Sequence, residues 1–354
     1  RIIPGPPPPG ATEPRLFSSM YDGLNVKAGR SGPIVRNGTF AYTGDDAIAW
    51  YMNPLLVLNT PEPSRAHLAL KNDVTTCRPG DRLRFPIPGT EATVTVTVAT
   101  VKPVRTQKAE LRDQVLALLP DYKGHTFNSV REVTFRNSVS LPPGATGINL
   151  AQAGYGFRIE NNRVFNSASR GIVCNLAGGS LRNNRIDTTF LCGIHVFEAT
   201  REGGPGFVED LAIAGNEVSW SCVNQPPNAG WSGGITVTTW SKGYTGSNGH
   251  RDLRILDNSV HHTVGPALQV HCAGDVLIRG NRFCHTHIAP AAVTTKHRDI
   301  RNGATVVLDD VRNVRLENNI ISDPGPYADR GEPLQVLRAQ GVQGGLSLPT
   351  PAGP

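Results

Sequence analysis

The sequence repeats one short pattern along most of residues 157–321. Each copy contains an apolar residue, two variable residues, an asparagine, one variable residue and a second apolar residue, as in VLIRGNRF (276–283). The spacings between the repeated asparagines are 22, 32, 42, 23 and 38 residues. The short spacings suit one turn of a coil of strands, and the longer ones leave room for loops. The repeated asparagines are Asn162, Asn184, Asn216, Asn258, Asn281 and Asn319.

A second element follows several of these asparagines by nine residues, as GIVC at Gly171, GIHV at Gly193 and ALQV at Ala267. GITV at Gly234 takes the same place after a longer loop. Each turn therefore contains three short strands separated by bends. Stacked strands of this kind place equivalent residues in columns about 4.8 Å apart, with apolar residues inside and asparagines able to pair along the stack. We predict an all-β fold, a right-handed parallel β-helix.

The same template fits the beginning of the chain and is then interrupted. Val35, Gly38 and Phe40 take the repeat positions, and Gly23 and Ala47 lie 24 residues apart in the second element. Between residues 54 and 125, alternating runs such as TVTVTVATV predict a small antiparallel barrel or sandwich-like insert, with a short helix or loop at 109–122. The predicted units are N-terminal turns (1–53), insert (54–125), main turns (126–325) and a surface or disordered tail (326–354).

Composition excludes several classes of function. The 354 residues carry a net charge of +6, but the 35 Lys and Arg are scattered, which predicts a solvated surface and no nucleic-acid partner. No apolar run reaches 18 residues, so we expect no membrane span. The six cysteines form no CxxC pair and could be thiols or disulfides; neither metal nor cofactor is predicted. The Pro-rich start suggests a processed chain of a secreted or periplasmic protein.

The stretch AYTGDDAIAW contains the adjacent acids Asp45 and Asp46. The repeat register stacks Asp46 above Asp22, so three carboxylates should gather at one corner of two turns, with a backbone kink at Gly44. Like charges at this range raise the pKa of at least one member. A protonated acid beside ionised carboxylates is the arrangement that glycoside hydrolysis requires.

These motifs resemble two families of glycoside hydrolases. YDGLN followed by TGDDAIA is similar to the paired motifs of family 28 polygalacturonases, which are inverting parallel β-helices. An insert after the acid pair, with CRPGDRLRF and GIHVFEA, makes residues 15–325 resemble the family 110 α-1,3-galactosidases. The resemblance implies that Asp45 is the general acid, and that Asp22 and Asp46 position and deprotonate water.

Further residues are candidates for substrate binding because they lie on the same predicted face or beside the acids. Alternation places His195 and Phe197 outside, and the equivalent residues of other turns share their columns. Trp231 and Trp240 flank GITV as stacking platforms or packing groups, and Asp309-Asp310 is interpreted as a turn. The predicted substrate-binding residues are Asn25, Trp50, Tyr51, Arg170, His195, Glu198 and His271.

The leading hypothesis is an inverting glycoside hydrolase acting on a galactoside-type or related glycan. One alternative is a Ca²⁺-dependent polysaccharide lyase, with the three aspartates as ligands and Lys27, Arg30 or Arg170 near the metal. Another is a glycan-binding β-helix without catalysis. All three have a carbohydrate partner, and the sequence decides neither the sugar and linkage nor the oligomeric state.

Overall fold

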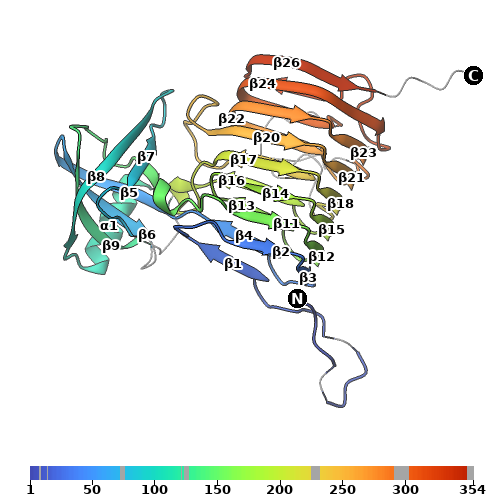
Figure 1. Ribbon diagram of the computed structural model, residues 1–354, viewed down its shortest axis with the longest axis horizontal. Coiled ribbons are helices and arrows are strands. Elements are labelled where there is room, and N and C mark those ends of the chain that lie inside the picture. The colour runs from blue at the N-terminus through green and yellow to red at the C-terminus, as the bar shows by residue number, and fades with distance from the viewer. Residues whose placement is uncertain are drawn as a thin grey trace, which may run out of the picture.

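The computed structural model describes residues 1–7, 9–13, 15–71, 76–120, 122, 127–224, 232–290 and 303–348. Over these residues the chain is a right-handed parallel β-helix with a separate antiparallel barrel at its side (Figure 1). The all-β prediction and the predicted combination of β-helix and small antiparallel insert are confirmed.

The β-helix has three faces, which the chain visits in a fixed order in each turn. Face A contains β1 (Leu24–Lys27), β4 (Ile48–Tyr51), β13 (Ile172–Asn175), β16 (Ile194–Glu198), β19 (Ile235–Thr239), the starts of β22 (Leu268–Arg279) and β24 (Val306–Asp323), and β25 (Leu334–Leu337).

Face B contains β2 (Ile34–Arg36), β11 (Arg158–Glu160), β14 (Gly179–Arg182), β17 (Glu209–Ala214), β20 (His250–Leu256), later parts of β22 and β24, and β26 (Gln340–Ser347). Face C contains β3 (Thr39–Ala41), β12 (Arg163–Ser167), β15 (Arg185–Thr189), β18 (Glu217–Ser221), β21 (Ser259–Thr263), β23 (Arg282–Thr286) and the end of β24.

The repeated asparagines form one continuous ladder at the bend between faces B and C. The Asn184 Oδ1 accepts hydrogen bonds from both the backbone N–H and the Nδ2 of Asn162, at 3.0 Å each. Asn216, Asn258, Asn281 and Asn319 repeat this pair of bonds from turn to turn. Each Nδ2 also donates to a backbone carbonyl of the preceding turn, as from Asn184 to Ile159 at 2.9 Å. Buried polar groups are therefore satisfied along the whole column.

The left-handed bend is made by the residue before each ladder asparagine. Asn161, Asn183, Asp257 and Asn318 have φ values of 52–56°, and Gly215 and Gly280 have 64° and 69°. These are the residue types that adopt this conformation most readily. The ladder asparagines use their side chains for hydrogen bonds along the stack, while the residue before each of them makes the bend.

The antiparallel barrel is formed by β5 (Pro54–Glu62), β6 (Arg65–Lys71), β7 (Arg82–Pro86), β8 (Thr93–Val104), β9 (Phe127–Phe135) and β10 (Thr146–Asn149). It has its own core around Leu55, Leu68 and Phe85, and α1 (Lys108–Leu118) packs Leu111 and Val115 on its outside. The predicted end of the insert is residue 125, but β9 and β10, which follow it, also belong to the barrel. Their alternation of apolar and polar residues resembles that of the β-helix strands, so the sequence pattern does not separate them. Of the two possibilities for residues 109–122, a short helix or a loop, the structure has a helix, α1.

The barrel packs against loops at the corner between faces A and B. Arg84 of β7 forms a buried ion pair with Glu209 and donates to the Phe207 carbonyl at 2.9 Å. Glu209 also pairs with Arg251 and accepts a hydrogen bond from Tyr155. Burial raises the pKa of Glu209, but these partners outweigh it and hold the pKa below its ordinary value. Two short 3₁₀ helices, η1 (Leu150–Gln152) and η2 (Thr200–Glu202), lie at the same corner.

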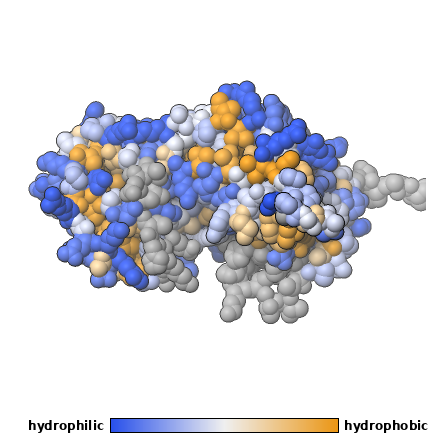
Figure 2. All heavy atoms as spheres, turned by 90° about the horizontal axis from the view of Figure 1, so that it is seen from below, coloured by the Kyte–Doolittle hydropathy of each residue, from blue (hydrophilic) through white to orange (hydrophobic). Residues whose placement is uncertain are grey.

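The two ends of the chain add to the β-helix. Ile2 and Ser19 form single parallel bridges to Phe40 and Thr43, and the exposed side chains of this end include Met20 and Tyr21. Figure 2 views the molecule from below and shows hydrophobic side chains among hydrophilic ones on both halves. At the other end, β25 and β26 pair with β24 as a further turn, so Leu334–Leu337 and Gln340–Ser347 belong to the sheet and not to a disordered tail.

The ladder predicts a large and local cost for losing one of its members. Asn216→Ala removes the acceptor for Asn184 and the donor to Asn258 and Leu181, which leaves buried polar groups without partners. We expect a loss of about 2–4 kcal/mol in the free energy of unfolding, measured by urea denaturation. The exposed Arg182→Ala on the neighbouring turn is the control, expected within about 0.5 kcal/mol of the parent. Equal stabilities of the two variants would contradict this role.

Candidate functional site

Three carboxylates meet at the corner between faces C and A. Asp22 precedes β1, and Asp45 and Asp46 precede β4; one oxygen of each lies within 4.8 Å of the others. The register that pairs Leu24 with Ile48 stacks Asp22 beside Asp46, and the Gly23 N–H donates to the Asp46 carbonyl at 2.9 Å. Asp46 is 2% exposed, whereas Asp22 and Asp45 are accessible. The predicted cluster of acids is therefore present as a geometric feature.

A column of hydroxyl groups lies at this corner, and in several turns it bonds to the backbone that leads into the next strand. The Thr43 Oγ1 donates to the Asp45 carbonyl at 2.8 Å, and the Ser167 Oγ lies 2.9 Å from that same carbonyl. Thr189 and Thr263 make the equivalent bond to the carbonyl two residues ahead, at 2.7 Å each. These are hydroxyl-stabilised turns, which fix the chain direction before the next strand. The sequence signal is a Ser or Thr three residues after each apolar residue of face C, which the motif analysis missed.

Asp45 and Asp46 lie in this turn and not in a strand, so strand alternation does not separate them. Gly44 is required here, because a Cβ on it would lie 2.7 Å from the Met20 carbonyl oxygen. Its role is this close approach of the N-terminal segment, and not a left-handed conformation. The Asp46 N–H donates to the Asp45 Oδ1 at 2.9 Å, which orients the first carboxylate toward the second residue.

Asp46 is held by groups from two further elements. The Arg170 guanidinium forms an ion pair with its Oδ2 at 3.1 Å, and the Arg170 N–H donates to Oδ1 at 3.0 Å. The Tyr51 hydroxyl donates to Oδ2 at 3.2 Å. Burial lowers the pKa of the Arg170 guanidinium, but the charge of Asp46 raises it by more. The pKa of Arg170 therefore lies above its ordinary value. These contacts fix Asp46 as an oriented acceptor.

Asp22 is the member whose protonation is most affected by its surroundings. Burial raises the pKa of Asp22, and the nearby charges of Asp46 and Asp45 raise it further, against a hydrogen bond from Asn25 that lowers it. Burial followed by the charge of Asp46 likewise raises the pKa of the Tyr51 hydroxyl, which stays protonated. The cluster therefore combines an oriented carboxylate with a neighbouring acid that keeps its proton to higher pH.

Aromatic side chains continue the site beyond Arg170. The Arg170 guanidinium carbon lies 5.4 Å from the centre of the Phe197 ring, and Phe197 stacks on Trp240 with centroids 4.7 Å apart. Trp240 is 38% exposed and offers a platform on which a sugar ring can stack. The Trp231 candidate lies outside the described residues.

Four predicted substrate-binding residues are not accessible. Trp50 points into the β-helix against Phe157 and is fully buried, because its position alternates with the outward Tyr51. His195, Glu198 and His271 are 0%, 0% and 1% exposed. Their contact with substrate stays a prediction, and the structure places all four side chains away from the surface. Asn25, Tyr51 and Arg170 lie beside the acids.

His195 and Glu198 instead support the aromatic platform. His195 stacks on Phe197 at 4.9 Å, its Nε2 bonds with the Thr238 hydroxyl at 2.9 Å, and its Nδ1 has no partner among the described residues. Burial, with Arg170 nearby, holds the pKa of His195 well below its ordinary value. The Glu198 carboxyl accepts bonds from Thr200 and Ser241, and burial raises its pKa to about 7.

His271 belongs to a separate group about 20 Å along the stack from Tyr51, at four strand spacings. Its Nδ1 lies 3.3 Å from Asp309, and its Nε2 lies 2.9 Å from Gln269. Arg338 of the last turn bonds to Asp309 at 2.9 Å. Asp309 is thus part of strand β24 with stacked partners, which corrects its interpretation as a turn. The group joins three turns near the C-terminal end.

The oxygen-only cluster of Asp22, Asp45 and Asp46 fits hard cations such as Ca²⁺ as well as acid–base chemistry.

All six cysteines are free thiols, so no disulfide holds the fold. Among the described residues, no helix has the length and apolar character needed to cross a bilayer.

Comparison with known proteins leaves the chain without an assigned family. No protein-family model matches the sequence, and no curated protein matches it. Among solved structures, the chain is similar to the tailspike protein gp49 from Pseudomonas phage LKA1, with 10% identity and a TM-score of 0.32. That match covers 85% of this chain and 50% of the tailspike chain, so the chain spans half of its length. The β-helix assignment rests on the strand pairing of the chain itself.

The buried Glu198 predicts a pH dependence of stability. The pKa of Glu198 rises from an ordinary 4.5 to about 7 on folding. The contribution of the protonated side chain to the free energy of unfolding is therefore fully present below pH 4.5 and is lost as the pH rises through 7. A shift of that size corresponds to about 3 kcal/mol. We expect Glu198→Gln to be less sensitive than the parent to a rise from pH 5 to pH 8, measured by urea denaturation at each pH. Identical pH profiles of the parent and the variant would refute this assignment.

Proposed function

We propose that the chain hydrolyses a glycosidic bond at the Asp22–Asp45–Asp46 cluster. The observation that carries this proposal is the approach of three carboxylate oxygens to within 4.8 Å, beside a stacked aromatic pair. Clustered carboxylates with different protonation supply both the acid and the water-activating base of glycoside hydrolysis. The resemblance of residues 15–325 to the family 110 α-1,3-galactosidases favours a galactoside-type or related glycan as substrate. Localisation in a secreted or periplasmic compartment is part of the same proposal.

Asp46 suits activation of water. Its ion pair with Arg170 and the bonds from Tyr51 and the Arg170 backbone fix its orientation. Water held between Asp46 and a second carboxylate would then be deprotonated as it attacks the anomeric carbon.

The identity of the general acid has two candidates within the cluster. The family resemblance favours Asp45, which is accessible and close to Asp46. The raised pKa favours Asp22, because burial and two neighbouring charges help it hold a proton. We adopt Asp45 as the acid, with Asp22 as the partner of Asp46 in positioning the water. The two candidates for the general acid are distinguished by how the rate of each variant depends on the leaving group of the substrate.

Replacement of the acids tests this proposal. Asp45→Asn and Asp46→Asn are expected to lower kcat/KM on a natural glycan by about 10²–10⁴-fold, while the exposed Asp252→Asn retains activity. An aryl glycoside with a good leaving group needs little protonation, so it should recover much of the rate in Asp45→Asn and little in Asp46→Asn. Recovery in Asp22→Asn instead would assign the acid to Asp22. Full activity of both Asp45→Asn and Asp46→Asn would exclude the cluster as the catalytic centre.

Stereochemistry is a second test. Inverting enzymes commonly separate their carboxyl groups by about 6.5–9.5 Å, and retaining enzymes by about 5–5.5 Å. The nearest oxygens here lie within 4.8 Å, which is short for an inverting pair. We nevertheless expect inversion, because both oxygens of Asp46 are engaged by Arg170 and Asp46 is better placed to orient water than to form a covalent bond. Proton NMR of the first product anomer decides this: the anomer of the substrate's own configuration would contradict inversion.

The oxygen-only ligand set also favours a second candidate, a Ca²⁺-dependent polysaccharide lyase. A lyase of this kind also needs a basic side chain near the metal. Arg30 is bound to Asp81 at 2.8 Å and Arg170 to Asp46, whereas Lys27 is exposed near Tyr51. A lyase would release an unsaturated, ultraviolet-absorbing product and lose activity with a chelator. Hydrolysis would give no such absorption. Glycan binding without either product would favour the non-catalytic alternative.

A further inference from the structure

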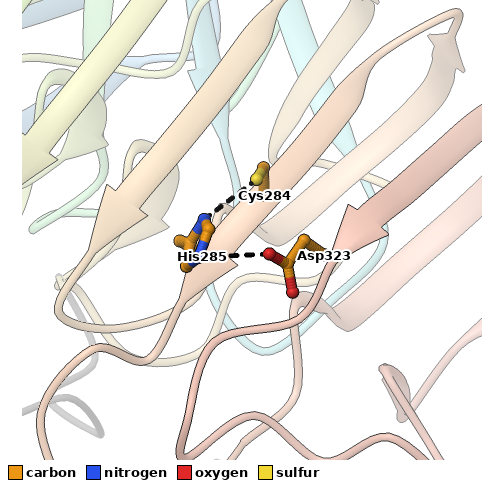
Figure 3. Close-up of side chains that lie close together, drawn as sticks. All are labelled: Cys284, His285 and Asp323. Atoms are coloured by element: carbon orange, nitrogen blue, oxygen red, sulfur yellow. Dashed lines mark hydrogen bonds and ion pairs between the residues drawn. The ribbon is translucent and has the colours of Figure 1, made fainter.

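A second group of chemically reactive side chains lies on face C, away from the acid cluster. Cys284 and His285 lie near the end of β23, and Asp323 ends β24 on the adjoining turn (Figure 3). The Cys284 Sγ lies 3.1 Å from the His285 Nδ1, and the His285 Nε2 lies 3.2 Å from the Asp323 Oδ2. One sulfur, one imidazole nitrogen and one carboxylate oxygen fall within 4.8 Å of one another.

Two departures from regular strand geometry bring these side chains together. Neighbours along a strand normally point to opposite faces, but His285 has a φ of 46°, so it points outward with Cys284 while Phe283 and Thr286 stay buried. A register shift between Phe283 and Cys284 then pairs Cys284 with Asp323. Such bulges re-aim side chains, and here the bulge directs the carboxylate toward the imidazole.

The orientation of the imidazole is fixed by its neighbours. The His285 ring stacks on His262 with centroids 4.8 Å apart and an interplanar angle of 14°. His262 stacks in turn on Trp220 at 4.7 Å. This row of rings leaves the nitrogen-bearing edge of His285 directed at Cys284 and Asp323 (Figure 3). The stacking therefore holds the imidazole in place before any ligand arrives.

We propose that Cys284, His285 and Asp323 bind a Zn²⁺-class transition-metal ion. Zinc takes thiolate at about 2.3 Å, imidazole at about 2.0–2.1 Å and carboxylate at about 2.0–2.2 Å, and tetrahedral ligand atoms then lie about 3.3–3.6 Å apart. The two observed contacts use opposite imidazole nitrogens and the ligand atoms spread over up to 4.8 Å, so Cys284 or Asp323 must rotate toward the nitrogen that binds the ion. The mixed sulfur, nitrogen and oxygen set suits Zn²⁺ or Co²⁺ better than Ca²⁺ or Mg²⁺, unlike the all-carboxylate acid cluster.

Three protein ligands leave one tetrahedral position for water, and the site is accessible because His285 and Asp323 have side chains that are 41% and 55% exposed. Binding would displace the thiol proton of Cys284. It would also cross-link β23 to β24 across consecutive turns. The site is independent of the proposed hydrolase activity.

Titration of the reduced, folded chain with Co²⁺ tests this proposal. We expect one Co²⁺ per chain with a sulfur-to-cobalt charge-transfer band, displaced by Zn²⁺, and a melting temperature that rises with Zn²⁺. Cys284→Ser should abolish the band, and His285→Ala and Asp323→Asn should each weaken affinity by at least about tenfold.

Asp252→Asn, an exposed aspartate on another face, is the matched control for Asp323→Asn, and Asp45→Asn tests whether the acid cluster takes the metal; neither should change the band. Circular dichroism shows whether each variant is folded. A folded parent chain without the band, or a band that persists in Cys284→Ser, would overturn the proposal. So would unchanged affinity in both His285→Ala and Asp323→Asn, which would indicate a single reactive thiol.

Discussion

The asparagine ladder is the interaction on which the remaining geometry depends. From Asn184 to Asn319, each Oδ1 accepts two hydrogen bonds from the turn before it, which fixes the register of these turns relative to one another. A slip of one residue would exchange buried and exposed side chains along a strand. The ladder also separates two tasks within one bend, because the residue before each asparagine takes the left-handed conformation. Loops of different length can therefore be inserted elsewhere in the turn while the stack keeps its register.

Register converts distant sequence positions into one site. Asp22 and Asp46 are neighbours because 24 residues make one turn there, and Arg170 reaches Asp46 across 124 residues because the barrel is inserted between consecutive turns. Crowding three carboxylates is unfavourable without compensation. Arg170 supplies the compensating charge, and the hydroxyl column holds the backbone that carries the acids. The site thus depends on stacking, because Asp22, the Asp45–Asp46 pair and Arg170 lie on three consecutive turns.

The sequence predicted the columns well, because repeat register and alternation are local rules. The stacking of Asp22 on Asp46 and the outward direction of His195 follow from them. Accessibility does not follow, because it depends on which loops cover a face. His195 points outward from the β-helix, yet it is buried against Phe197, and Glu198 at the strand end is buried with Thr200 and Ser241. Trp50 was selected by proximity to the acids, although alternation with Tyr51 directs it into the core.

The two clusters of reactive groups share one structural cause. A regular β-helix strand separates adjacent residues onto opposite faces, so neighbours can cooperate only where that rule is broken. At the acid cluster the break is a hydroxyl-stabilised turn that presents Asp45 and Asp46 together, and Gly44 within it lets the N-terminal segment approach closely. At the second cluster it is the left-handed His285 and the bulge before Cys284. The ladder makes such local breaks tolerable, because the hydrogen bonds that hold the register lie at a different bend of the turn.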